Sequence, residues 1–218
     1  MASDTAKPPR FFVLEHAMGS SHDTEFVDVG GHVGDAPRCP LCGDVVGMRA
    51  WLPPHRGELT LHGQDFGDFV RGPGNSILLS KRFVDAFRAE ALTGLGEFHP
   101  VEVVRTRSKR KGPKPTTIPT YLCATPALGS AVVDEARSHI QRSEPISCDY
   151  CRSTGIDANH GFTLEPGSWQ GEDIFRPRGL TGRHVVSEQF AQWVAQHGFT
   201  NVRLIPTEEI AYDYASST

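Results

Sequence analysis

The chain has 218 residues, of which 38% are apolar and 22% charged, and its net charge is −4. This composition is ordinary for a folded globular protein and excludes a collagen-like or low-complexity chain. The sequence contains no apolar run near the eighteen residues that a membrane span requires, so we expect no membrane segment.

Residues 1–9 are predicted to form a short disordered tail before the first strand. The N-terminal stretch lacks the apolar core of a secretory signal. We therefore expect a cytoplasmic protein, in which cysteines stay reduced and disulfides are rare.

The next segment, residues 10–107, is predicted to be an α+β unit. Strands are expected at RFFVLE (10–15), GDFVRG (67–72) and EFHPVEVV (97–104), which are rich in aromatic and β-branched residues. Before the last strand, the stretch 76–94 predicts a helix that begins after Ser80 and ends at Gly94. Its apolar residues recur at helical spacing, at Phe83, Val84, Phe87 and Leu92.

A second unit, residues 120–218, repeats this order. Strands are expected at TYLCAT (120–125), EDIFRP (172–177) and VRLIPTEEI (202–210). The stretch 183–198 predicts a helix that begins after Ser187 and ends at Gly198, with Phe190, Trp193 and Val194 on one face. Four landmarks recurring at nearly constant offset predict a duplication. Identity between the halves is low, so chance similarity of two ordinary α+β patterns is the alternative.

Each half carries one C-x-x-C pair, Cys39 with Cys42 and Cys148 with Cys151. In a reducing compartment this spacing favours metal binding over disulfides, and four thiolates suit tetrahedral zinc. Such a shell has no open position for water or substrate, so it predicts one structural zinc that joins the two halves as a split zinc ribbon. The sequence leaves open whether zinc or iron occupies the site.

The residue after each pair differs between the halves. Gly43 suits the positive φ that directs backbone N–H groups at sulfur, whereas the second pair has Arg152 there and glycine only at Gly155. The second turn is therefore expected to close differently. The fifth cysteine, Cys123, is expected to be a buried small apolar side chain.

Enzyme motifs are absent from the sequence. It contains no phosphate-binding loop, no nucleophile elbow and no H-E-x-x-H, and its histidines are scattered, for example His32, His55, His99 and His160. The acidic pairs Glu172–Asp173 and Glu208–Glu209 are expected to be solvated. We therefore predict a non-enzyme with no catalytic residues; a hydrolase or transferase remains a third hypothesis.

The segment 105–115 holds six basic residues and no acid. It overlaps residues 108–119, which we interpret as a solvated connector between the halves. The alternative is a nucleic-acid-binding zinc ribbon that uses this segment, although no aromatic residue lies among the basic ones. Binding of an acidic protein partner is another possible use. The basic residues are Arg105, Arg107, Lys109, Arg110, Lys111 and Lys114.

The motifs CPLCG and CDYC, with the strand–helix–strand stretches ILLSKRFVDAFRAEALTGLGEFHPVEV and HVVSEQFAQWVAQHGFTNVRLIP, resemble the double-CXXCG proteins. This bacterial family includes immunity proteins of Sit-type polymorphic toxins, and the resemblance covers residues 11–210. It implies a non-catalytic antitoxin that neutralises a cognate toxin, and it carries over only the four paired cysteines.

The stretches 44–66 and 153–171 are candidates for the toxin-binding surface. They contain Trp51, Phe162 and Trp169, residue types that anchor protein interfaces and also pack in cores. The sequence does not distinguish these two roles, and it does not fix the oligomeric state.

Overall fold

The computed structural model describes residues 8–110, 115 and 117–213. Within these residues the chain forms fourteen strands and two helices, so the predicted α+β class is confirmed. Most of the predicted tail 1–9 lies outside the described residues, as do Lys111 and Lys114 of the basic segment.

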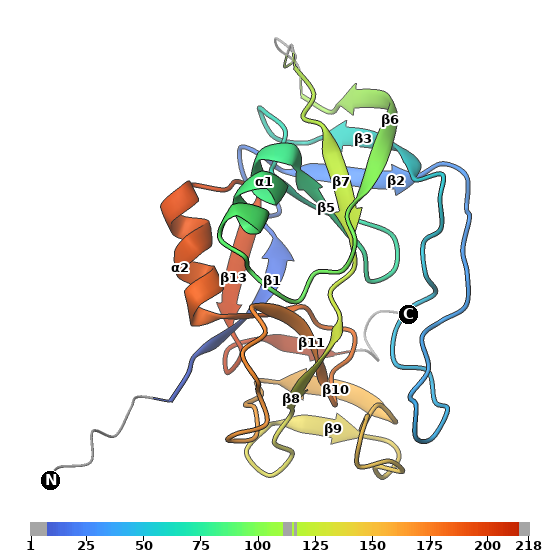
Figure 1. Cartoon of the computed structure of the whole chain (residues 1–218), viewed down its shortest axis with the longest axis vertical. Coiled ribbons are helices and arrows are strands. Elements are labelled where there is room, and N and C mark those ends of the chain that lie inside the picture. Colours follow the sequence, from blue (N-terminus) through green and yellow to red (C-terminus); the bar gives the residue numbers. More distant parts are fainter. Residues whose placement is uncertain (1–7, 111–114, 116, 214–218) are drawn as a thin grey trace, which may run out of the picture.

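The strands form three sheets (Figure 1). The five-stranded sheet has the order β13 (Val202–Pro206), β1 (Phe11–His16), β12 (Val185–Ser187), β11 (Ile174–Arg178) and β8 (Leu128–Val132). The six-stranded sheet has the order β2 (Thr24–Asp28), β3 (Arg56–Leu61), β6 (His99–Ser108), β7 (Tyr121–Ala124), β5 (Ile77–Ser80) and β4 (Phe69–Arg71). The three-stranded sheet has the order β14 (Ala211–Asp213), β10 (Ile156–His160) and β9 (Ile140–Arg142).

The two predicted halves exchange a strand. β7, from the second half, lies between β5 and β6 of the first, and β1, from the first half, lies between β12 and β13 of the second. The registers correspond, because Tyr121 of β7 pairs with Ser80 and Phe11 of β1 pairs with Ser187. Neither half therefore completes its central sheet with its own strands.

Both helices begin where the sequence predicted. α1 (Lys81–Ala89) follows Ser80, whose Oγ accepts a hydrogen bond from the Phe83 N–H at 3.3 Å. α2 (Glu188–His197) follows Ser187, whose Oγ accepts from the Phe190 N–H at 3.1 Å. Each hydroxyl satisfies an N–H that has no carbonyl partner in the first turn.

The helices end differently from the prediction in one case. Gly198 ends α2 with a left-handed φ of 58°, as predicted. The prediction that Gly94 ends α1 is wrong, because α1 ends at Ala89 and the left-handed residue is Ala91, at φ 52°. A Cβ on Gly94 would lie 1.8 Å from the Ile174 carbonyl oxygen, so this glycine allows two backbone segments to approach each other.

The predicted apolar faces of both helices are buried. They meet in one core cluster, where Phe83 and Phe190 lie with ring centroids 6.3 Å apart and Phe83 lies 5.0 Å from Trp193. Strands of both large sheets add Leu79, Ile174 and Val186 to this cluster. The helices lie beside each other on one side of the molecule (Figure 1), so the core joins the two predicted halves.

Candidate metal centre

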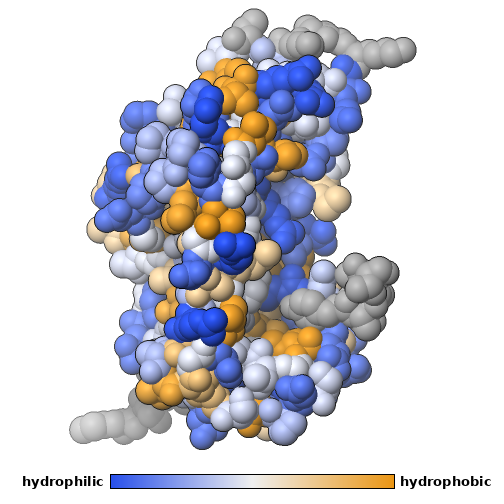
Figure 2. Space-filling model, turned by 90° about the vertical axis from the view of Figure 1, so that its right-hand side faces the viewer, coloured by the Kyte–Doolittle hydropathy of each residue, from blue (hydrophilic) through white to orange (hydrophobic). Residues whose placement is uncertain are grey.

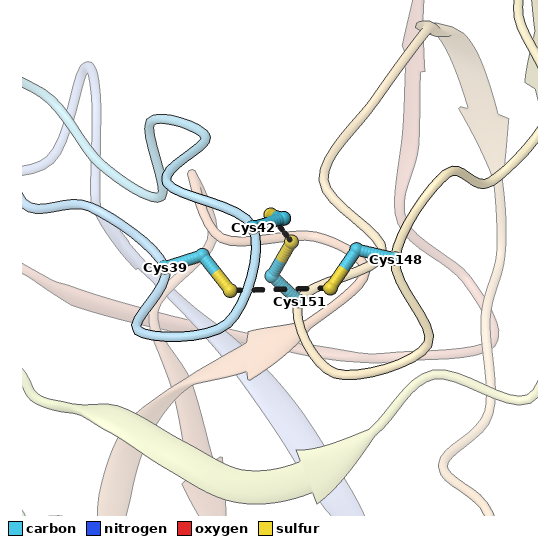
Figure 3. A group of neighbouring side chains, drawn as sticks. All are labelled: Cys39, Cys42, Cys148 and Cys151. Atoms are coloured by element: carbon cyan, nitrogen blue, oxygen red, sulfur yellow. Dashed lines mark hydrogen bonds between the residues drawn. The ribbon is translucent and has the colours of Figure 1, made fainter.

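The two C-x-x-C pairs lie in the connections between antiparallel strands. Cys39 and Cys42 lie between β2 and β3, and Cys148 and Cys151 lie between β9 and β10. Figure 3 shows the two loops approaching each other so that all four thiols point into one space. The fold therefore brings together the residues that the sequence predicted as ligands.

The four sulfur atoms all lie within 4.8 Å of one another. Cys39 Sγ lies 4.0 Å from Cys148 Sγ, and Cys42 Sγ lies 3.6 Å from Cys151 Sγ. These separations are too long for disulfides, and all four cysteines are free. Four sulfurs at about 2.3 Å from a tetrahedral zinc ion would be about 3.8 Å apart, so the spacing fits such an ion.

The first pair lies in a tight turn. Gly43 has a φ of 80°, and its N–H donates to the Cys39 carbonyl oxygen at 3.0 Å. The Cys39 N–H in turn donates to the Asp44 carbonyl oxygen at 2.7 Å. The positive φ is the one that the sequence predicted for a glycine after the second cysteine.

The second pair closes in the same way, so the prediction of a different closure is wrong. Arg152 takes the position of Gly43 with a φ of 50°, and its N–H donates to the Cys148 carbonyl oxygen at 3.0 Å. Its side chain bonds to the Val133 carbonyl oxygen and to Glu165. These contacts hold a residue with a Cβ in a conformation that usually favours glycine.

The thiols shift each other's pKa in opposite directions. Burial raises the pKa of Cys39, but backbone N–H groups of Cys42 and Leu41 outweigh burial and bring it to about 7. At Cys42 the backbone N–H of Asp44 lowers the pKa, yet desolvation and the neighbouring thiols raise it well above its usual value. Ionisation of one thiol therefore disfavours ionisation of its neighbour, and a bound cation would remove this repulsion between thiolates.

The arrangement fits a structural metal ion. Cys151 is fully buried and Cys39 nearly so, whereas Cys42 is exposed. Tetrahedral four-thiolate shells bind zinc or iron. In the part of the chain that the structure describes, the ligand group contains these four sulfurs alone, which would fill all four positions.

One buried arginine, Arg176, holds the loop that carries Cys39 and Cys42. This residue was not identified from the sequence. Arg176 Nη1 donates to the Val46 carbonyl oxygen at 2.8 Å and to that of Thr181 at 3.2 Å, and its Nε donates to that of Pro126 at 2.9 Å. Arg176 thereby links β11 to the segment just after Cys42. The signal was present, because GDFVRG and EDIFRP share an arginine as well as an aspartate.

Cys123 and the acidic pair Glu172–Asp173 are held by packing or hydrogen bonds within the fold. Cys123 is 3% exposed in β7, so the prediction of a buried small apolar side chain is confirmed, and burial raises its pKa to about 11. The prediction of a solvated Glu172–Asp173 pair is wrong. Asp173 is 8% exposed and bonds to Thr93, while Glu172 accepts hydrogen bonds from the N–H and hydroxyl of Ser130.

The basic segment is partly a strand. Arg105 and Arg107 belong to β6, so the strand extends beyond its predicted end at residue 104. Arg107 forms an ion pair with Glu58 at 2.6 Å, which neutralises part of the positive charge.

The aromatic residues of the stretches 44–66 and 153–171 pack inside the protein. Trp51 is 7% exposed and donates from Nε1 to Asp28, and Phe162 is 1% exposed. Trp169 is half-buried against Phe11, with ring centroids 5.3 Å apart. These three residues therefore do not anchor a partner from an exposed position.

Neither helix of the described chain is long and apolar enough to cross a membrane. No protein-family model matches the chain, and no curated protein is significantly similar to it.

Proposed function

We propose that the chain is a cytoplasmic immunity protein that binds and neutralises a cognate bacterial toxin, without catalysis. The observation that carries this proposal is the closed cluster of four sulfurs within 4.8 Å, which leaves no ligand position for a substrate. The resemblance to double-CXXCG proteins supplies the partner class. The proposed metal is one zinc ion held by Cys39, Cys42, Cys148 and Cys151.

We further propose that the chain arose by duplication. Corresponding residues occupy corresponding places in the two halves, as the paired serines before α1 and α2 and the left-handed residues Ala91 and Gly198 illustrate. Each half also receives its central strand from the other. In this proposal the zinc ion ties together the same loop of both copies.

The proposed toxin-binding surface is the 29–55 loop, the connection between β2 and β3 that carries the first C-x-x-C pair. Leu41, between its two cysteines, is 73% exposed, and Met48 is 57% exposed. The face with this loop displays separate hydrophobic patches among polar residues (Figure 2). The exposed apolar residues of the loop are Val29, Val33, Leu41, Val45, Met48 and Leu52.

The 29–55 loop is ordered by contacts of its own. Val33 bridges to Trp51 and Arg38 bridges to Val45, so the two arms of the loop lie side by side. Metal binding would fix its tip as well. A surface that is rigid before binding loses less conformational entropy on association, which favours a tight inhibitor.

Co-expression with the toxin encoded by a neighbouring gene tests the proposal. We expect growth rescue and a stable complex with the wild-type chain. Leu41→Asp together with Met48→Asp should weaken the complex at least about tenfold, because two apolar contacts would be replaced by desolvated charges. Val104→Asp, at an exposed apolar position on β6, is the matched control and should bind normally.

The nucleic-acid alternative predicts a different result. It requires salt-dependent binding of DNA or RNA that decreases when Arg105, Lys109 and Arg110 are reversed in charge. Such binding together with failure to rescue growth would contradict the immunity proposal.

A further inference from the structure

A hollow of about 220 Å³ lies beside the 29–55 loop, outside the sulfur cluster. Met18 and Met48 contribute apolar side chains to its lining. Its polar lining residues include Glu15, Arg71, Asn75, Arg183 and His184.

Two neighbouring residues of this lining have buried polar atoms without partners. Among the described residues, Nε and Nη2 of Arg183 and Nε2 of His184 are buried and make no hydrogen bond. The third guanidinium nitrogen, Nη1 of Arg183, lies 3.5 Å from Glu15 Oε1. The guanidinium also lies over the Tyr212 ring, 4.5 Å from its centroid. Arg183 is therefore a buried cation with incomplete hydrogen bonding, and a nearby anion would stabilise it.

Arg71, a third polar residue of the lining, differs in its contacts from its counterpart in the second half, Arg176. Arg71 and Arg176 are each the third residue after a buried aspartate, Asp68 and Asp173. The Arg176 guanidinium is buried and donates to three backbone carbonyls. The Arg71 guanidinium makes no hydrogen bond or ion pair with any described residue, and Arg71 is exposed at the hollow. The arginine at this position therefore holds the fold together in the second half, whereas in the first half its guanidinium is available to a ligand.

The charges around the hollow are mainly positive. Burial, together with the positive charges of Arg176, Arg71 and Arg183, lowers the pKa of His184 to about 4. His184 is therefore neutral at pH 7. Glu15 is the single carboxylate in the lining, against the guanidinium groups of Arg71 and Arg183.

From this arrangement we propose that the hollow binds a small molecule with an anionic head, a carboxylate or a phosphate, and a short apolar part. The anionic oxygens would form strong charge-assisted hydrogen bonds with Arg71, and the buried guanidinium of Arg183 would add a second positive charge beside them. The apolar part would contact Met18 and Met48. This site lies outside the sulfur cluster and shares Met48 with the proposed toxin-binding loop.

Titration of the full, metal-loaded chain followed by NMR tests the site. Inorganic phosphate, acetate and benzoate are added separately at constant ionic strength, with chloride as the reference. We expect saturable shifts of the Arg183 Nε–H and of the Asn75 amide with at least one probe. The stronger of phosphate and acetate identifies the head group, and tighter binding of benzoate than of acetate identifies the apolar wall.

Arg71→Gln is the informative variant, because its guanidinium has no described partner and the fold does not depend on it. We expect its affinity for the best probe to fall at least about tenfold, the effect of losing one charge-assisted hydrogen bond. Arg105→Gln, at an exposed arginine of β6, is the matched control and should bind as the wild type. No saturable binding of any probe, or unchanged affinity in Arg71→Gln, would overturn the proposal.

Discussion

The carboxylate of Asp173 accepts two hydrogen bonds from Thr93, one from the backbone N–H at 2.9 Å and one from the hydroxyl at 3.0 Å. Thr93 follows α1 in the first half of the chain, and Asp173 precedes β11 in the second. Asp68, just before β4, makes the same pair of contacts with Thr200 after α2, both at 2.8 Å. Each half thus fixes the exit of the other half's helix.

The two aspartates also join the helix entrances to this network. The Ser80 hydroxyl donates to Asp68 at 2.6 Å, and the Ser187 hydroxyl donates to Asp173 at 3.4 Å. Asp68 additionally binds Arg82 through both carboxylate oxygens. Desolvation raises the pKa of Asp68, but Arg82, Ser80 and Thr200 together hold it below its usual range. Both aspartates are therefore placed to stabilise the exchanged arrangement.

The Asp173–Thr93 contact gives a first prediction. Asp173→Asn should lower the free energy of unfolding by about 1–3 kcal/mol, because the buried hydrogen bonds that its carboxyl group accepts from Thr93 are weakened. Urea denaturation at pH 7 measures the change. Asp85→Asn, which breaks an exposed ion pair with Lys81 within α1, should cost less than about 0.5 kcal/mol. An equal loss of unfolding free energy in the two variants would mean that the Asp173–Thr93 contact stabilises the protein no more than an exposed ion pair does.

Gly94 gives a second prediction. Gly94→Ala should destabilise the protein by more than about 3 kcal/mol or prevent folding, because the new Cβ would collide with the Ile174 carbonyl oxygen at 1.8 Å. Gly96→Ala is the matched control two residues away, since its Cβ would meet nothing closer than 3.9 Å. Thermal unfolding of the two variants compares them directly. A stable Gly94→Ala protein would show that β11 does not approach this glycine closely.

Metal removal gives a third prediction. Purified protein should contain one metal ion per chain, and Cys148→Ser should lose it, whereas Cys123→Ala should retain it. We expect elemental analysis to find zinc, while iron would still support the structural role. The site contributes little to the main cores, because Cys39 and Cys151 form a small separate cluster with Val46.

The consequence of metal loss is therefore local. Hydrogen exchange after chelation should show lost protection around residues 38–46 and 148–153, while Phe83 and Val186 in the core between the helices stay protected. Metal-free protein as purified, or unchanged exchange after chelation, would contradict the structural role of the site.

His184 gives a fourth prediction, for pH. Its pKa of about 4 lies below the ordinary value of 6.5, so between these values the unfolded chain binds a proton that the folded chain does not. Stability should therefore decrease as the pH falls from about 6.5 to about 4, by up to about 3 kcal/mol from this group. The contribution is fully present above pH 6.5.

Urea midpoints of wild-type and His184→Gln protein across this range measure the effect. The variant should show the smaller loss of stability on acidification, since glutamine does not titrate. Protonation of the cysteines affects both proteins alike and cancels in the difference. His139→Gln, at an exposed histidine, should keep the wild-type pH dependence. The same slope in His184→Gln as in the wild type would refute the assignment.

Short-range sequence signals predicted the local features. Ser80 and Ser187 begin the helices, and the helical spacing of Phe83 or Phe190 identifies the buried faces, because these effects act within one or two turns of chain. The same signals failed at Gly94. A glycine near a helix end usually stops the helix. This glycine is instead required by the close approach of the Ile174 backbone, eighty residues away in the chain. The sequence also left open whether Trp51 and Phe162 are buried, since burial depends on packing partners far away in the chain.

The sequence by itself predicted that Cys39, Cys42, Cys148 and Cys151 form one cluster, since two C-x-x-C pairs suit a tetrahedral four-thiolate site. It also predicted both helices and the strands β1, β4, β6, β7, β11 and β13 in their order, but not β2, β3, β8, β9 or β10. Only the tertiary structure decided that β1 and β7 change places between the halves and that Asp68 and Asp173 bind across them. Strand pairing depends on hydrogen bonds between segments far apart in the chain, and such pairing is not encoded in local residue patterns.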